Sequence, residues 1–290
     1  MFKQFKKHSA LAATLLCLSW STSATDVSSV TLSKAIQADG MTLGQDGSLY
    51  VASAWEGTTI AKIDLASGNV SDFSTSQKGP IDITQKSDGT FYATNWQGTS
   101  ITKLSTDGSR RDWSTVGPKG DGLAFDSKGN LWLTTGSANE VRKIAPDGTV
   151  TTVAKDGILK YPLGIAISEK DEVFIGGGQT GEIYKLSKNG DPQLFATVPG
   201  PGPWRIGHLL YTNGRLFASG LNSNKIFEVA KDGTVNAIAG SGAAGHTDGP
   251  AMQASFTFPA SLEASADGKT LYVFSSLEKT DKLRVISIEK

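Results

Sequence analysis

Short hydrophobic stretches alternate with turn sequences along almost the whole chain. Six segments share one order: a short apolar strand, a turn near Asp-Gly or Asn-Gly, and a second strand rich in aromatic residues. They read MTLGQDGSLYVAS, IDITQKSDGTFYAT, GLAFDSKGNLWLTT, GIAISEKDEVFIGG, GHLLYTNGRLFASG and SLEASADGKTLYVFS. No stretch between them has the 3.6-residue period of an amphipathic helix. The pattern therefore predicts an all-β protein built from a repeated hairpin.

The turns of these hairpins recur at regular intervals. Their turn residues are spaced by 42, 40, 42, 43 and 54 positions, and they are Gly47, Gly89, Gly129, Asp171, Gly214 and Gly268. A second series runs in phase with spacings of 40, 40, 42 and 43, at Gly68, Gly108, Gly148, Gly190 and Gly233. Two hairpins make four strands, and four strands in a repeat of about 40–45 residues are typical of a β-propeller blade. Six repeats predict a six-bladed β-propeller of four-stranded antiparallel blades.

The two ends of the chain are irregular in complementary ways. The last repeat has only three strands, whereas the segment VSSVTLSKAI at 27–36 precedes the first repeat without a partner. If this N-terminal strand pairs with the last blade, the ring closes and an exposed sheet edge is covered. We expect that closure.

The N-terminus has the order of a secretory signal peptide. Three lysines precede an apolar run and then small residues, which predicts cleavage after Ala24. We therefore expect residues 1–24 to be a signal peptide and 25–290 to form a single propeller domain in a periplasmic or secreted protein. The apolar run is too short to span a bilayer, so no membrane anchor is expected.

Charge and cysteine content argue against nucleic-acid binding and against disulfide bonds. Without residues 1–24 the chain carries 25 basic and 28 acidic residues, a net charge of −3. This balance gives no electrostatic footprint for nucleic acid. The only cysteine, Cys17, lies in the signal segment, so the exported protein must fold without disulfides.

Loop sequences divide the propeller into a monotonous face and a variable face. In an up-and-down blade, the loops between the second and third strands lie on the same face as the links between blades, and here these segments are the variable ones. Ligands bind preferentially at such loops on a rigid scaffold. The candidate ligand-binding residues on this face are Trp55, Glu56, Asn95, Trp96, Trp204, Arg205 and His208. Two alternatives remain: Trp55 and Trp96 pack between blades, and His208 is simply hydrogen-bonded at the start of a strand.

Carboxylates near the axis suggest a second kind of site. The position eight residues before each turn starts the innermost strand, and around the ring it reads Asp39, Ile81, Asp121, Leu163, Ile206 and, with a longer turn allowed, Ser261. Asp39 and Asp121, with Asp82 one place further on, suit a hard divalent cation such as Ca²⁺, and Glu56 and Asn95 would complete its ligands. The alternative is that these acids accept backbone N–H bonds.

Several stretches resemble known families. IAGSGAAGHTDGPAMQASFTFPASLEASADGKTLYV is similar to NHL repeats, and DGLAFDSKGNLWLTT resembles the gluconolactonase and senescence-marker-protein family as well as the streptogramin lyases. The resemblance covers essentially the whole chain after residue 24 and implies a six-bladed propeller. It specifies blades more than chemistry.

The catalytic residues that these families imply are incomplete here. The lactonase resemblance implies a divalent metal held by a Glu, two Asn and an Asp, but the matching row offers only Asp39 and Asp121, with Leu163 at a position where an Asn is expected. The lyase resemblance implies a His and a Glu in the last two blades, but FPASLEASADGKTLYVFS contains no histidine and Glu263 lies within a strand.

Two functions therefore stay open. One is an exported propeller that binds a small molecule or a protein on its loop face. The other is a metal-dependent hydrolase or lyase acting on a lactone-type ring ester, in which a cation on Asp39 and Asp121 would polarise the carbonyl and a carboxylate or His208 would move the proton.

Overall fold

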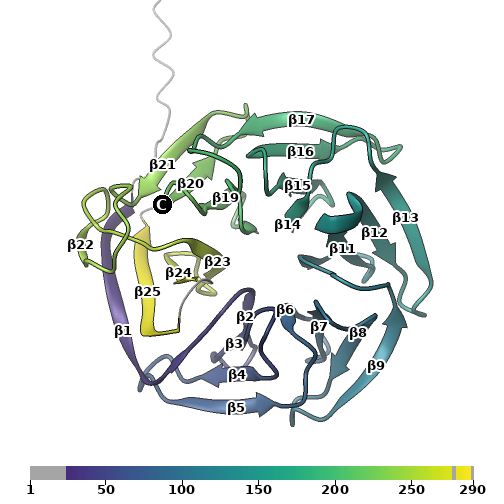
Figure 1. Cartoon of the computed structure of the whole chain (residues 1–290), viewed down its shortest axis with the longest axis horizontal. Coiled ribbons are helices and arrows are strands. Elements are labelled where there is room, and N and C mark those ends of the chain that lie inside the picture. Colours follow the sequence, from purple (N-terminus) through teal and green to yellow (C-terminus); the bar gives the residue numbers. More distant parts are fainter. Residues whose placement is uncertain (1–23, 276–278, 289–290) are drawn as a thin grey trace, which may run out of the picture.

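Six antiparallel sheets surround a central axis in the computed structural model, which describes residues 24–275 and 279–288 (Figure 1). The predicted signal peptide lies outside the described residues, apart from Ala24. The predicted all-β fold and the predicted number of blades are both confirmed. No helix in the described part of the chain is long and apolar enough to cross a membrane.

The first five blades each contain four strands in sequential order. Blade one consists of β2 (Met41–Leu43), β3 (Leu49–Ala52), β4 (Ile60–Ile63) and β5 (Val70–Ser74). Blade two consists of β6 (Pro80–Gln85), β7 (Phe91–Asn95), β8 (Ser100–Leu104) and β9 (Arg110–Thr115). Blade three consists of β10 (Leu123–Phe125), β11 (Leu131–Thr135), the 3₁₀ turn η1 (Gly136–Ala138), β12 (Glu140–Ile144) and β13 (Val150–Lys155).

The remaining blades follow the same plan. Blade four consists of β14 (Pro162–Ile167), β15 (Val173–Gly177), β16 (Glu182–Leu186) and β17 (Pro192–Thr197). Blade five consists of β18 (Leu209–Thr212), β19 (Arg215–Gly220), β20 (Lys225–Val229) and β21 (Val235–Ala239). Blade six runs outward from the axis as β23 (Pro259–Ala264), β24 (Thr270–Ser275), β25 (Thr280–Ile288), β1 (Ala24–Ile36) and β22 (Gly249–Pro250).

The predicted turn residues of both series have left-handed backbone conformations. All eleven have positive φ, between 60° and 91°. Glycine adopts this region without steric cost, which explains why it fills ten of these positions. Blade five has the tightest innermost hairpin, because Thr212 pairs directly with Arg215. The intervening Asn213 and Gly214 have φ of 49° and 75°, as a two-residue type I′ turn requires.

Closure of the ring by the N-terminal strand is confirmed. Strand β1 pairs antiparallel with β25, with Val27 opposite Ile286 and Val30 opposite Leu283. The prediction missed one detail: β22 adds a short bridge outside β1, so blade six has five strands instead of four.

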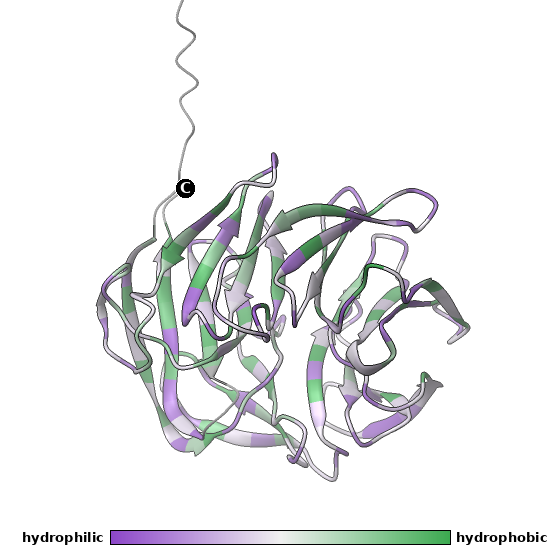
Figure 2. Ribbon diagram, turned by 45° about the horizontal axis from the view of Figure 1, so that its top comes forward, coloured by the Kyte–Doolittle hydropathy of each residue, from purple (hydrophilic) through white to green (hydrophobic). Residues whose placement is uncertain are grey.

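The hydrophobic core is divided among the interfaces between neighbouring blades. Each of the six clusters of buried side chains joins two adjacent blades; one of them packs Leu49 and Val51 of blade one against Phe274 and Leu283 of blade six. Apolar and polar residues alternate along many strands (Figure 2). Because each sheet contributes to two of the six clusters, its inner strands are packed on both faces, and the rigid ring holds the inter-blade links in place around the axis.

Candidate functional site

A cavity of about 520 Å³ opens at the axis, on the face where the links enter the innermost strands. One residue from each blade forms its first level, which we term the entrance ring: Asp39, Ile81, Asp121, Leu163, Gly207 and Ala260. These positions are equivalent by backbone bonding. The amides of Asp39, Asp121 and Gly207 donate to the carbonyls of Ala52, Thr134 and Ser219, which lie on the neighbouring strands.

The sequence predicts four of these six residues correctly and two wrongly. In blade five the short Asn213–Gly214 turn shifts the register, so that Gly207 lies at the entrance and Ile206 is fully buried between blades. In blade six the uniform spacing holds, so that Ala260 and not Ser261 lines the cavity.

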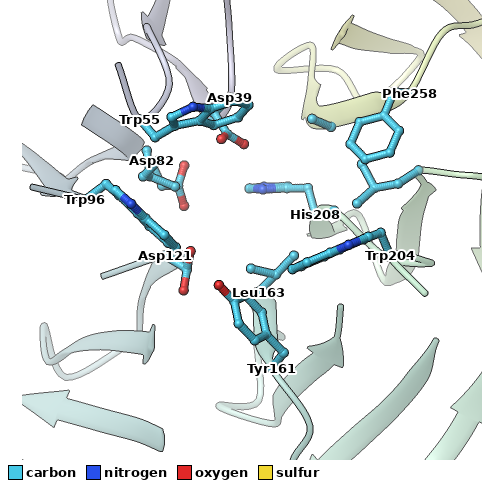
Figure 3. A pocket seen from close by; sticks show the side chains of 16 residues that line it. Asp39, Trp55, Asp82, Trp96, Asp121, Tyr161, Leu163, Trp204, His208 and Phe258 are labelled. Carbon is cyan, nitrogen blue, oxygen red and sulfur yellow. The ribbon is translucent and has the colours of Figure 1, made fainter. Parts of the chain in front are cut away.

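A second level lies one residue deeper, and half of its residues are glycine. It consists of Gly40, Asp82, Gly122, Gly164, His208 and Ser261. Asp82 and His208 come from opposite blades and point toward each other across the axis (Figure 3). Both also line a deeper cavity of about 260 Å³. These two side chains therefore form the floor between the entrance cavity and the channel below it.

Five aromatic side chains form the walls of the entrance cavity: Trp55, Trp96, Tyr161, Trp204 and Phe258 (Figure 3). All are half-buried. The Tyr161 and Trp204 rings meet edge to face, with centroids 4.9 Å apart. The Lys119 ammonium lies 5.3 Å from the centroid of the Trp96 ring. The tryptophans therefore expose part of their surface to the cavity. Side chains packed entirely between blades would not do so.

Three of these aromatic residues hold strained backbone. Tyr161, Trp204 and Phe258 have φ of 53°, 61° and 47°, and Gly79 and Lys119 occupy the same place in blades two and three with φ of 68° and 62°. The left-handed region costs a non-glycine residue about 1–2 kcal/mol, and such strain concentrates at functional sites. Three blades thus retain a bulky aromatic residue where glycine would be less strained. The sequence carried a signal for Tyr161 and Phe258, which our prediction missed, because these five positions repeat with the period of the blades.

The structure separates the predicted ligand-binding residues into two groups. Trp55, Trp96, Trp204 and His208 line the cavity, as do the proposed metal ligands Asp39 and Asp121.

The other predicted ligand-binding residues lie elsewhere. Glu56 is exposed and outside the cavity lining. Asn95 Oδ1 accepts from the Lys78 amide at 3.1 Å, and Asn95 Nδ2 donates to Thr102 Oγ1 at 2.9 Å, so this side chain braces its own loop. Arg205 Nε donates to the Gly202 carbonyl at 2.9 Å and stabilises the proline-rich link.

The three cavity carboxyls have different environments. The Asp39 carboxyl has no hydrogen-bond or ion-pair partner among the described residues, and burial raises its pKa to about 7. Burial also raises the pKa of Asp82 to about 8, although its carboxyl accepts from the amides of Leu123 and Ile83, both at 2.8 Å. The pKa of Asp121 is raised by burial, and its Oδ2 accepts from the Gly136 amide at 2.7 Å. The alternative, in which these carboxyls accept hydrogen bonds from backbone amides, thus holds for Asp82 and Asp121 but not for Asp39.

The cavity offers few metal ligands. Within residues 24–275 and 279–288, no three His, Cys, Asp or Glu side chains are grouped closely enough to hold a metal ion. Burial lowers the pKa of His208 to about 4, so this imidazole is neutral at pH 7. The residues present therefore do not supply a complete ligand set, and the cation on Asp39 and Asp121 remains a prediction from the sequence.

Substituting Asp39→Asn is expected to stabilise the protein at alkaline pH. The folded-state pKa of Asp39, about 7, lies above the ordinary value of 3.8. The folded protein therefore retains a proton that the unfolded chain releases, and the free energy of unfolding falls as the pH rises between these values. Asparagine removes this loss, so the variant should exceed the wild-type Tm at pH 8 by about 10 °C, since each pKa unit between 3.8 and about 7 is worth about 1.4 kcal/mol and each kcal/mol shifts the Tm by about 2–4 °C.

Circular dichroism melts at pH 5 and pH 8 measure this effect. The exposed Asp26→Asn serves as the control and should match the wild type at both pH values. A gain for Asp39→Asn that is larger at pH 5 than at pH 8 would contradict the expected direction.

Comparison with known proteins defines the family. The family model of the virginiamycin B lyases matches residues 25–247. The chain belongs to the virginiamycin B lyase family. A virginiamycin B lyase from Nocardia farcinica is 28% identical over 196 residues, which cover 68% of this chain and 67% of that relative. The predicted resemblance to lyase-type blades is confirmed.

Solved structures share the fold of this virginiamycin B lyase family member. A streptogramin B lyase has a TM-score of 0.66 at 18% identity and covers 91% of this chain and 97% of its own. An auxiliary nutrient binding protein from Bacteroides thetaiotaomicron has a TM-score of 0.74 at 14% identity, covering 92% and 77%. A gluconolactonase from Xanthomonas campestris has a TM-score of 0.66 at 12% identity, covering 92% and 97%. At these identities the likeness is one of fold, and it confirms the predicted propeller class.

Blade six of this member of the virginiamycin B lyase family differs from the lyase resemblance, which implies a histidine and a glutamate in the last two blades. The family match ends at residue 247, before β23. Glu263 lines the deeper cavity of about 260 Å³, where its carboxylate accepts hydrogen bonds from the amides of Leu43 and Ala264 at 3.1 and 2.7 Å. It therefore ties blade six to blade one, and the strands from β23 to β25 contain no histidine to accompany it.

Proposed function

We propose that this member of the virginiamycin B lyase family binds a small organic molecule in the entrance cavity. The observation that carries the proposal is the wall of five half-buried aromatic side chains, three of them on strained backbone, around about 520 Å³. Binding sites for small molecules are typically concave, mostly apolar and within about 300–1,000 Å³. A concave cavity of this size favours a small molecule over a protein as the partner.

We also propose that the protein is exported and acts in the periplasm or outside the cell. Its support is the order of basic, apolar and small residues in the predicted signal peptide, together with a chain that needs no cysteine after residue 24. A structural neighbour is named an auxiliary nutrient binding protein, a role compatible with capture of small molecules outside the cytoplasm.

A second candidate function is catalysis on a lactone-type ring ester. Family membership favours it, and so do the two carboxyl groups whose pKa values lie near neutrality, because a general acid or base works best near the ambient pH. The incomplete metal ligand set and the absence of histidine from the last blade weigh against it.

Replacing Trp204 by glycine should separate binding from stability. Glycine relieves the left-handed backbone at this position, so the Tm should stay within a few degrees of the wild type while one wall of the cavity is lost. The matched control is Lys119→Gly, which relieves the equivalent position of blade three and removes no residue of the cavity lining. We expect the neutral fluorescent probe N-phenyl-1-naphthylamine to bind the wild type and the control, and to bind Trp204→Gly at least about tenfold more weakly.

Two results would change the proposal. Equal probe affinity in the two glycine variants, or no probe binding to the wild type, would remove the entrance cavity as the binding site. Conversion of virginiamycin B by the purified wild-type protein, followed by mass spectrometry, would replace binding with catalysis.

A further inference from the structure

The titratable side chains that line the entrance cavity include three carboxyl groups and one imidazole. Its lining contains three aspartates and one histidine but no lysine or arginine. The histidine is uncharged at neutral pH because burial lowers its pKa to about 4. Two basic residues lie near the rim and are engaged there: Lys119 covers the Trp96 ring, and Arg205 donates to the carbonyls of Gly202 and Thr180.

Two of the three carboxyl groups lack a full set of partners. Neither oxygen of Asp39 accepts a hydrogen bond from the part of the chain that the structure describes. Asp121 is only 3% exposed, and the structure bonds its Oδ2 to the Gly136 amide but gives its Oδ1 no partner. Asp82 differs, because both of its oxygens accept from backbone amides. Both side chains line the cavity, so Asp39 and Asp121 are the groups whose hydrogen bonding a ligand there would complete.

The aromatic walls are also suited to a positive charge. Indole rings attract ammonium groups placed over their faces. The contact between Lys119 and Trp96, at 5.3 Å, already uses this attraction at the rim. Trp55 and Asp39 line the same side of the cavity, and Trp204 lies on the opposite side (Figure 3). An ammonium group inside the cavity would therefore find ring faces and unpaired carboxylate oxygens together.

We infer that the ligand of this cavity is an organic cation, with an ammonium group attached to an apolar body. This inference rests on the proposed binding function and specifies its ligand class. The ammonium group pairs with Asp39 and Asp121, and the apolar body fills the space between the aromatic rings. An anionic ligand is disfavoured, because it would meet only carboxyl groups and an uncharged imidazole.

Three probes of nearly equal size test the inference with the whole protein. They are 2-phenylethylamine, which is a cation, 2-phenylethanol, which is neutral, and 3-phenylpropanoate, which is an anion. We expect isothermal titration calorimetry at pH 8 to give the amine at least about tenfold higher affinity than the alcohol, and to give no binding of the anion. Asp39→Asn combined with Asp121→Asn should reduce the preference for the amine to about twofold or less. The exposed Asp26→Asn should retain it.

The outcomes separate this inference from the proposed function. If the alcohol or the anion binds as tightly as the amine, or if the double variant keeps the full preference, the cation inference is overturned. The same holds if none of the three probes binds. In each case, binding of neutral N-phenyl-1-naphthylamine that depends on Trp204 would leave the proposed function standing, and its absence would remove both.

Discussion

Deleting residues 24–36 should abolish cooperative folding of the propeller. These residues form β1, which pairs with β25 along most of its length and buries Val27, Leu32 and Ile36. Each of these side chains contributes about 1.5–3 kcal/mol when buried, and the sum approaches the whole stability of a typical domain, about 5–15 kcal/mol. The deletion also uncovers the edge of β25, which can then pair with another copy. Circular dichroism melts and size-exclusion chromatography should show loss of the transition and aggregation.

Two triple variants test whether the buried side chains of β1 are what stabilises the ring. Aspartate at the three buried positions, Val27, Leu32 and Ile36, should reproduce the effect of the deletion. Aspartate at the three exposed positions, Thr25, Ser28 and Ala35, should leave the Tm within a few degrees of the wild type. A monomeric deletion variant with an unchanged Tm would show that the ring does not depend on this strand.

Replacing Arg284 by methionine should destabilise the same closure by about 2–3 kcal/mol. Arg284 lies in β25, is 3% exposed and donates to the carbonyls of Ser255 and Thr247 at 2.6 and 2.9 Å. Its guanidinium also pairs with Asp248 at 2.9 Å, and it thereby fastens the loop that carries β22. Methionine keeps the length of the side chain but leaves these acceptors unpaired, so the Tm should fall by about 5–10 °C.

The matched control for this prediction is Lys282→Met, two residues earlier in β25. Its side chain is only half-buried and makes no ion pair among the described residues. The control should lose less than about 1 kcal/mol in urea unfolding. If the two variants lose equal stability, the network around Arg284 does not hold the closure.

The repeat of turn glycines was enough to predict the number of blades, and the unpaired strand at 27–36 was enough to predict the closure. Both follow from backbone constraints that act locally: positive φ at the turns, and a strand edge that needs a partner. In blade six the uniform spacing held, and only our allowance for a longer turn was wrong. The register within blade five was not predictable from spacing alone. It depends on whether a turn has two residues, as at Asn213–Gly214, and the spacing of the turn glycines does not encode that length.

The candidate site was predictable in outline and not in its bonding. The aromatic loop positions Trp55 and Trp96 stand out because their sequences repeat. Asn95 stands out for the same reason, yet the structure uses its amide to brace a loop. The pKa of Asp39 depends on burial that only the assembled ring creates. Tyr161 was missed although its position repeats with the period of the blades, because its left-handed backbone is unusual for a bulky residue.

Joining the first strand of the fold to the last has a consequence for biogenesis. During synthesis β1 emerges before every other strand of the ring, whereas its partner β25 emerges after all of them. Blades one to five can form as each emerges, but β1 and β25 can pair only after all the other strands have been synthesised. A chain synthesised only as far as β24 therefore has an open ring, and a truncated product without β25 cannot close it.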